Sequence, residues 1–169
     1  MAKIELQRPL SVPAIPARAA ISSILHDIAE GREQWADFAL YCTFGSIGLP
    51  DVGYIAIPVK ISNLDERLEP RHEIRFHMQA AREPQAFPLF DGALGIDVSG
   101  ASSSTLWLAG TYDVPLSGLG TLLNQTMMRG TAEKTISNMV DVLAESTVAR
   151  VQKREIAETR YRLLLKSGD

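Results

Sequence analysis

The feature that most constrains the fold of this chain is a change in its hydrophobic period at Pro115. Between Tyr54 and Val114, apolar and polar residues alternate in several runs, which is the period-two pattern of half-buried strands. From Leu119 to Val151 and beyond, apolar residues instead recur every three or four positions, as on one face of a long helix. Strands grouped apart from helices predict an α+β fold, with an antiparallel sheet and the helices on one face of it.

Three of the alternating runs define the inner face of the predicted sheet. Their inward members are Ile74, Phe76, Met78, Phe90, Gly92, Leu94, Leu106, Leu108, Gly110 and Tyr112. Glu73, Arg75 and His77 fall on the outward face. Because the side-chain period of a strand is two, a slip of one residue in register would exchange the two faces together. Gly92 and Gly110 remove side chains from the inner rows, which is typical of a strong bend or of a cavity.

The N-terminal part of the chain predicts a strand followed by short helices. Lys3–Leu10 alternates as a strand does, and proline residues then interrupt the pattern. A helical stripe follows, formed by Ile21, Ile24, Leu25 and Ile28. Pro16 suits the first position of this helix, and Gly31 suits its end. Trp35–Tyr41 predicts a second short helix, and Asn63–Pro70 predicts a charged turn.

Three stretches of sequence, taken with this order of elements, carry a resemblance to a known family. They are Val12–Arg18, Phe87–Leu94 and Leu106–Leu116, the last continuing through Gly118–Gly120 to Ala132–Thr135. The chain resembles the START-like SRPBCC superfamily. The last two stretches resemble a bacterial branch in which a strand ends in a proline and opens directly into the long helix. The resemblance covers essentially the whole chain.

This resemblance implies the helix-grip fold, a curved antiparallel β-sheet wrapped around one long C-terminal helix, with two short helices near the N-terminus. It also implies a single START-like domain over residues 1–169. The basic residues near the C-terminus predict that residues 151–169 form a helical extension or tail of this domain. Members of the superfamily are small-molecule binders, lipid carriers and, in a minority, cyclases or dehydratases that act on polyketides. They share no universal set of catalytic residues, so the resemblance assigns none here.

The ligand-binding residues that we predict line an apolar cavity between the sheet and the long helix. They are Ile74, Phe76, Met78, Phe90, Leu94, Leu106, Leu108, Gly110, Tyr112, Leu123, Met127 and Met139. Methionine supplies soft, adaptable lining. Tyr112 is the best inward polar candidate, because a buried Tyr O–H needs a hydrogen-bond partner and can instead orient a ligand. The alternative, that the same residues fill a solid core, stays open, since periodicity alone does not separate the two.

Residues that would carry catalysis or hold a metal ion are scarce. His72 and His77 lie five positions apart on a predicted strand, hence on opposite faces, so they do not converge on one metal ion. Cys42 is the single cysteine, which excludes an internal disulfide and a multi-cysteine metal site. The sequence contains neither an HExxH nor a G-x-S-x-G motif. We therefore predict no catalytic residue, no metal site and no cofactor.

Charge and hydropathy argue against several classes of function. The chain has 17 Lys and Arg residues against 20 Asp and Glu residues, and its net charge of -3 argues against a nucleic-acid-binding surface. No apolar run approaches the roughly 20 residues that span a bilayer. Met1–Leu10 lacks the layout of a signal peptide, so we expect a cytoplasmic protein without an integral membrane segment.

Basic residues gather near the C-terminus. Glu155 and Glu158 alone oppose Arg150, Lys153, Arg154, Arg160, Arg162 and Lys166. The rest of the chain holds eleven basic and eighteen acidic residues, a net charge of −7. The first interpretation is that the basic end of a long helix complements the negative end of the helix dipole. A docking surface for an anionic partner or a membrane is the alternative.

The first hypothesis for function is the binding or carriage of a lipophilic small molecule in the apolar cavity, without catalysis. The second is a polyketide cyclase/dehydratase-like enzyme, which needs an inward acid–base pair within hydrogen-bond reach of the ligand. The aliphatic and aromatic inner rows favour the first hypothesis over the second. The third is a protein-interaction module without a ligand, which would use the basic C-terminal helix. A homodimer stays open under all three hypotheses.

Overall fold

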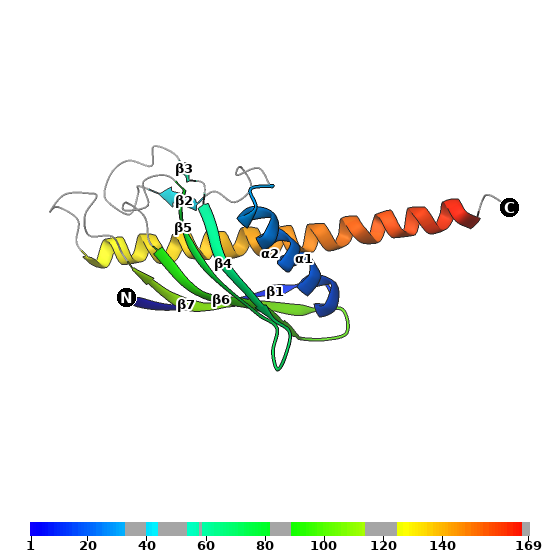
Figure 1. Ribbon diagram of the computed structural model, residues 1–169, viewed down its shortest axis with the longest axis horizontal. Helices are drawn as coiled ribbons and strands as arrows, with labels where there is room; N and C mark the ends of the chain where they lie inside the picture. Colours follow the sequence, from blue (N-terminus) through cyan, green and yellow to red (C-terminus); the bar gives the residue numbers. More distant parts are fainter. Residues whose placement is uncertain (33–39, 44–53, 58, 82–88, 114–124, 167–169) are drawn as a thin grey trace.

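Figure 1 shows the chain as a computed structural model. The structure describes residues 1–32, 40–43, 54–57, 59–81, 89–113 and 125–166, and the side chains of 1–32, 59–81, 89–113 and 132–165. Within these ranges the elements follow the predicted order of a strand, a helix, a run of strands and one long helix.

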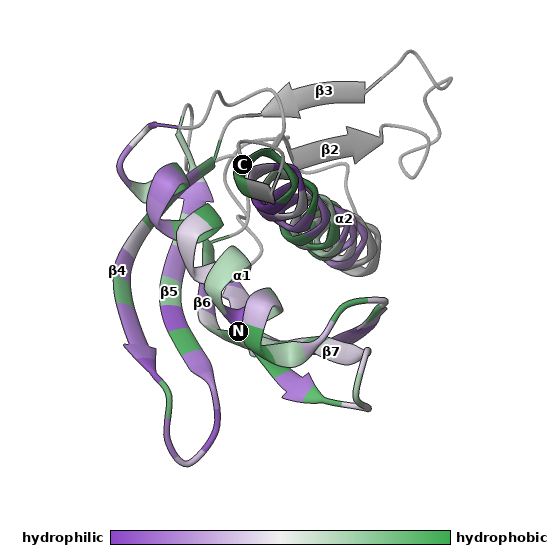
Figure 2. Ribbon diagram, turned by 90° about the vertical axis from the view of Figure 1, so that its right-hand side faces the viewer, coloured by the Kyte–Doolittle hydropathy of each residue, from purple (hydrophilic) through white to green (hydrophobic). Residues whose placement is uncertain are grey.

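Five antiparallel strands form the main sheet, in the spatial order β1-β7-β6-β5-β4. Their bounds are β1 Ala2–Leu10, β4 Val59–Arg67, β5 Glu73–Ala80, β6 Leu89–Val98 and β7 Ser104–Asp113. A separate antiparallel pair is formed by β2, Leu40–Thr43, and β3, Tyr54–Ile57. The helices are α1, Ala14–Ala29, and α2, Gln125–Lys166. Figure 2 shows the sheet curving around both helices, which confirms the predicted α+β helix-grip arrangement.

The register of the sheet brings the predicted inward residues onto one continuous face. Phe90 pairs with Tyr112, and Leu94 pairs with Leu108, so the inner rows of β6 and β7 lie side by side. The inward members of β5 are at most 2% exposed, whereas Arg75 on the opposite face is exposed. The period-two prediction of inner and outer faces is therefore confirmed.

Two predicted segments differ from the structure. The second short helix was expected to end at Tyr41, but Leu40–Thr43 is a strand, and residues 33–39 lie outside the described part of the chain. The charged turn was expected to begin at Asn63, but β4 continues to Arg67. Asn63 adopts a positive φ of 56° beside a shift in the pairing of β4 with β5. Because asparagine tolerates this backbone region, the strand bulges there and resumes instead of turning.

Helix α1 begins earlier than its proline predicts and ends where its glycine predicts. It starts at Ala14, so Pro16 occupies the third position, where a missing backbone N–H still costs no helical hydrogen bond. Gly31 follows the last turn with a φ of 68°. Its N–H donates to the carbonyl oxygen of Ile28 at 3.1 Å, and the N–H of Arg32 donates to that of Asp27 at 2.8 Å. This pair of bonds satisfies carbonyl groups that the end of a helix leaves unpaired.

Gly92 and Gly110 pair with each other in the ladder between β6 and β7. A Cβ atom on Gly110 would lie 2.6 Å from the carbonyl oxygen of Asp91 and 2.7 Å from the ring of Phe90. Neither distance is sterically allowed. The absence of side chains at Gly92 and Gly110 therefore lets the two strand backbones approach each other closely and lets the Phe90 ring lie against them. Their role in the fold is to make that approach fit.

Helix α2 has two parts with different surroundings. From Ala132 to Val151, residues at helical spacing are buried against the sheet and α1. From residue 152 to residue 165 every side chain is exposed. We call residues 152–165 the extension, and Figure 1 shows it projecting beyond the sheet. Within the described residues, no helix is both long enough and apolar enough to cross a membrane.

Candidate functional site

The candidate site is the apolar region between the concave face of the sheet and the first part of α2. Nine of the predicted lining residues are at most 5% exposed and belong to one cluster; they are Ile74, Phe76, Met78, Phe90, Leu94, Leu106, Leu108, Tyr112 and Met139. Gly110 lies on the same face and is half-buried. Leu123 and the side chain of Met127 lie outside the described residues. Whether the clustered residues line a ligand remains a prediction.

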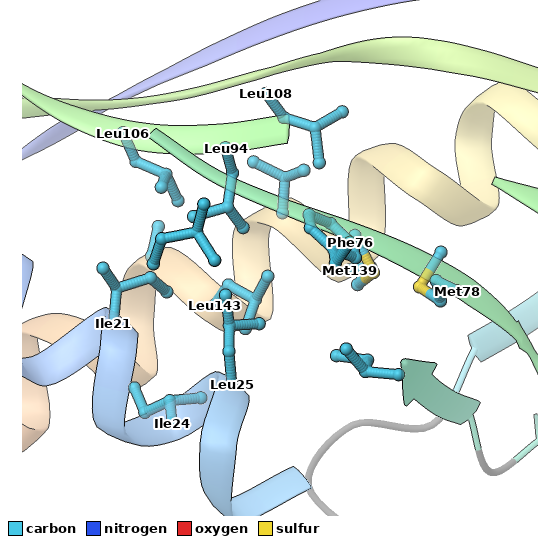
Figure 3. Close-up of a cluster of buried hydrophobic side chains, with 14 of the residues drawn as sticks. Ile21, Ile24, Leu25, Phe76, Met78, Leu94, Leu106, Leu108, Met139 and Leu143 are labelled. Carbon is cyan, nitrogen blue, oxygen red and sulfur yellow. The ribbon is translucent and has the colours of Figure 1, made fainter. Parts of the chain in front are cut away.

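Helix α1 fills one end of this space. Its residues Ile21, Ile24 and Leu25 are fully buried, and Figure 3 shows them in the same cluster as Leu106 and Leu143. The helix contacts β4, β6, β7 and α2. This end of the concave face is therefore occupied by aliphatic side chains of the protein itself.

The other end of the space carries aromatic and thioether side chains. The rings of Phe76 and Phe90 lie with their centroids 5.4 Å apart and their planes tilted by 39°. Figure 3 shows Phe76 and Met78, both from β5, and Met139, from α2, in this part of the cluster. Thioethers are flexible and polarisable, so this end adapts its shape more readily than the end that α1 fills.

One polar pair lies at the edge of this aromatic end. Tyr112 is 1% exposed, and its O–H donates a hydrogen bond of 2.8 Å to the carboxylate of Glu133 on α2. The predicted need of the Tyr112 hydroxyl for a partner is thus met by a carboxylate of the protein. The pair joins β7 to the first part of α2.

Arg8 is an inward charged residue that the sequence analysis did not single out. It lies opposite Leu106 in the pairing of β1 with β7, on the concave face. Its guanidinium donates to Ser137 Oγ at 2.7 Å and also to the carboxylate of Asp141, both on α2. The hydrogen bond to Asp141 raises the pKa of Arg8. The sequence did contain a signal for this inward position, because Arg8 continues the alternate positions occupied by the apolar residues Ile4 and Leu6 in β1.

A second ion pair ties α2 to α1. Arg150 donates to Asp27 Oδ2 and to Ser23 Oγ, both at 2.8 Å. The hydrogen bond from Arg150 lowers the pKa of Asp27. Arg150 therefore has a structural partner, in addition to any effect on the helix dipole.

His72 is a buried polar residue that the sequence analysis left without a role. It is fully buried just before β5, in phase with Ile74. Its Nδ1 accepts the backbone N–H of Ile96 at 3.1 Å, and its Nε2 lies 3.2 Å from the carboxylate of Glu66. Burial lowers the pKa of His72, although Glu66 opposes this effect. Since Nδ1 accepts a hydrogen bond, the neutral ring with its hydrogen on Nε2 fits this position and links β5, β6 and β4.

His77 lies on the outward face, as predicted. Its Nδ1 is 3.3 Å from a carboxylate oxygen of Asp91, its cross-strand neighbour, and its side chain is 39% exposed. His72 and His77 thus lie on different faces and have separate partners. Among the described residues, no three His, Cys, Asp or Glu side chains gather where they could hold a metal ion.

Comparisons with known proteins reveal the fold but no close relative. No protein-family model matches the sequence, and no curated protein matches it. A norcoclaurine synthase from Thalictrum flavum, solved as a point mutant with a transition-state analogue, matches with a TM-score of 0.52 and 9% identity. The match covers 91% of this chain and 96% of that one.

Two bacterial structures match over similar lengths. The Zhui aromatase/cyclase from Streptomyces sp. R1128 gives a TM-score of 0.47 at 12% identity, covering 90% of this chain and 94% of that one. A START superfamily protein from Mycobacterium smegmatis gives 0.47 at 13% identity, covering 89% and 97%. At such identities a likeness carries information on the fold alone. Together with the strand order and the long helix in the concavity, the match to the synthase shows that this chain has the helix-grip fold.

Proposed function

We propose that this protein binds a lipophilic small molecule in the apolar space between the concave face of the sheet and the first part of α2, and carries it without transforming it. The site we propose lies at the end away from α1, around Phe76, Met78, Phe90 and Met139. Leu123 and Met127 remain in the proposed lining as sequence-based predictions.

One observation carries the proposal, namely the chemical character of the inward rows. The described inward residues of β5, β6 and β7 are hydrocarbon, thioether or aromatic, apart from Tyr112 and the terminal Ser104. Ser104 donates to the carbonyl oxygen of Val12 at 2.9 Å, and Tyr112 donates to Glu133. A ligand beside these residues meets apolar surface and polar groups that already have protein partners. Such a surface supports binding by burial more than it supports proton transfer.

Burial alone is sufficient for useful affinity. A ligand that buries about 300 Å² of apolar surface gains on the order of 7 kcal/mol, at roughly 25 cal/mol per Å², before the cost of association is subtracted. Micromolar affinity therefore needs no charged contact. The soft thioethers of Met78 and Met139 favour ligands that vary in shape.

Native mass spectrometry of the gently purified full chain tests the proposal. We expect the protein to carry an additional mass from a co-purified small molecule. Organic solvent should release this molecule, and it should compete with a fluorescent lipophile for binding. The volume-conserving change Met139→Leu should alter affinity for that lipophile several-fold while keeping the fold, whereas His77→Gln on the outward face should leave it unchanged. A chain that carries no added mass and binds no lipophile would contradict the proposal.

A cyclase-like enzyme is the second candidate function, and one contact favours it. The hydroxyl of Tyr112 and the carboxylate of Glu133 form a hydrogen-bonded pair, and a general acid and base must lie within such reach of each other and of a substrate. The variant Tyr112→Phe separates the two candidates, because it removes the hydroxyl and keeps the ring. We expect lipophile binding to change by less than about threefold, that is by less than about 0.7 kcal/mol. A loss of turnover of a polyketide-like substrate in Tyr112→Phe and in Glu133→Gln, with binding intact, would establish the enzyme instead.

A further inference from the structure

An open groove lies outside the concave site, between α2 and the end of β1. It has a volume of about 560 Å³ and is lined by Pro9, Leu10, Ser11, Ala144, Glu145, Val148, Ala149 and Gln152. Most of this lining is apolar, and Glu145 adds an acidic group to it. Along α2, the groove lies at the C-terminal end of the part that packs on the sheet, next to the start of the extension.

The face of α2 that lines the groove continues into the extension. From Val148, Ala149 and Gln152, steps of three and four residues lead to Ile156, Thr159 and Leu163. Residues at these steps share one face of a helix. We call this face, residues 145, 148, 149, 152, 156, 159 and 163, the α2 stripe. Its two large apolar members beyond the groove are exposed, Ile156 by 68% and Leu163 by 63%.

We propose that the α2 stripe binds the α2 stripe of a second copy of this chain, with the two helices antiparallel. Ala149 and Leu163 each lie seven residues from Ile156. A two-fold axis at Ile156 therefore sets Leu163 of one copy opposite Ala149 of the other, inside its groove. The small side chain of Ala149 leaves room for the large side chain of Leu163. Because of the two-fold axis, each copy inserts its Leu163 into the groove of the other, and the contact forms twice in one dimer.

The charge of the chain favours this antiparallel arrangement. The extension holds four basic and two acidic side chains, a net charge of +2, and the rest of the chain carries −5. Antiparallel helices bring the basic extension of each copy beside the acidic body of the other. Parallel helices would set the two extensions, and the two bodies, against each other.

An anionic membrane is the other partner that a basic helix with exposed leucines fits, and the geometry favours it less. A helix that lies in a membrane interface gathers its apolar residues on one face. Leu163 and Leu165 are equally exposed, by 63% and 62%, but two residues along a helix correspond to about half a turn, so they lie on opposite sides. The groove also gives Leu163 a receptor, which a membrane would leave empty.

Sedimentation velocity of the full chain over a wide range of concentration tests the proposal, with one matched pair of variants. We expect a monomer–dimer equilibrium for the natural sequence. Leu163→Gln should raise its dissociation constant by about a hundredfold or more, because the two-fold axis removes the buried side chain twice. Leu165→Gln changes the same residue type at the same exposure on the other side of the helix, and it should leave the dissociation constant unchanged. Rising salt should weaken the dimer, since opposite charges contribute to it.

Cysteine cross-linking tests the direction of the helices. In a Cys42→Ser background, the pair Ala149→Cys and Leu163→Cys should form a dimer under mild oxidation, because a disulfide needs Cα atoms about 4.4–6.8 Å apart. The two positions are fourteen residues apart on one helix, about 21 Å, so they do not bridge within a chain. Leu163→Cys alone would cross-link in parallel helices and should not do so here.

Three outcomes would overturn the proposal. The first is a natural sequence that stays monomeric at every concentration. The second is a dimer that Leu165→Gln weakens as much as Leu163→Gln does. The third is a monomer that binds vesicles of phosphatidylglycerol and phosphatidylcholine and loses this binding equally in both variants, which would assign the extension to a membrane surface. None of these outcomes bears on ligand binding, so the carrier proposal is tested separately.

Discussion

The two parts of α2 form one helix in two environments. Up to Val151, the helix is held by burial, by hydrogen bonds that it accepts from Tyr112 and Arg8, and by the bond that its Arg150 donates to Asp27. Beyond it, the extension has an ion pair of 3.0 Å between Arg154 and Glu158, one turn apart, and no buried side chain among its described residues. Packing against the sheet stabilises the first turns of the helix, so helix nucleation is not required within the extension. The extension stays helical by adding backbone hydrogen bonds to a helix that already exists. The comparison shows that a helix can run past the core that stabilises it.

The largest difference between the two parts should appear when a leucine is shortened in each. Leu143 is 2% exposed in the core, and Leu143→Ala should lower the free energy of unfolding by about 2–5 kcal/mol. Leu163→Ala should change it by less than about 0.5 kcal/mol. Urea unfolding at a protein concentration that keeps the chain monomeric measures both. Equal losses in the two variants would mean that the extension packs on its own body.

The next-largest difference in unfolding free energy should appear when one hydrogen-bonded carboxylate is removed from each part of α2. Asp141→Ala removes the carboxylate that holds the guanidinium of Arg8, and we expect a loss of about 1–2 kcal/mol, reduced from the value for a buried pair because Asp141 is half-exposed. Glu158→Ala breaks the solvent-exposed pair of the extension and should cost about 0.3–0.5 kcal/mol. The same urea titrations measure both losses. A loss for Glu158→Ala as large as that for Asp141→Ala would refute the distinction.

Mild acid, in the range where histidine titrates, should destabilise the body more than the extension, because the extension contains no histidine. Burial lowers the pKa of His72 in the folded state. As the pH falls, the His72 imidazole is therefore protonated in the unfolded chain at a higher pH than in the folded chain. The contribution of His72 to stability is complete above about pH 6.5, the pKa of an unfolded histidine, and decreases as the pH falls toward the lowered folded value. The slope in that window is at most about 1.4 kcal/mol per pH unit.

Urea unfolding between neutral and mildly acidic pH measures this slope. His72→Gln should flatten the slope while it lowers stability at neutral pH. His77→Gln, on the outward face, is the control and should retain the slope. A slope that survives His72→Gln would place the responsible group elsewhere.

The smallest effect on the body should come from breaking the extension itself. Ala157→Pro removes a helical hydrogen bond and strains the preceding turn, which costs about 3 kcal/mol within a helix. The far-UV circular dichroism signal of helix should therefore decrease. The urea midpoint of the monomer and the affinity for a lipophile should stay within error, because neither depends on residue 157. A shift in that midpoint would show that the extension stabilises the body.

Much of the fold follows from local pattern, and the departures have local reasons as well. Alternation placed Phe76 and Leu108 on the inner face, because the period of a strand admits only two faces. The strand at Leu40–Thr43 was missed because a short apolar run with aromatic residues fits a helix as well as a strand. The extension of β4 past Asn63 was missed because a polar residue with positive φ marks a turn and a bulge alike.

The polar groups around the candidate site were less predictable than its apolar lining. Arg8 and Asp141 lie far apart in sequence, and their pairing depends on how α2 crosses β1, which no local pattern encodes. His72 could have been placed inward by its phase with Ile74, but its two partners come from other strands. The exposure of Leu163 could not be predicted either, since helical spacing continues unchanged where the body ends.

The paired glycines of β6 and β7 set a limit on how this sequence can diverge. A Cβ on Gly92 or on Gly110 would lie within 2.8 Å of the other glycine's Cα. A substitution at one position therefore has no rescuing substitution at the other, since neither has a side chain to give up. The apolar residues around them exchange more freely, so long as their total volume is kept. Over evolutionary time, the apolar side chains of this face can therefore change while the two glycines, and the close strand approach that they allow, stay fixed.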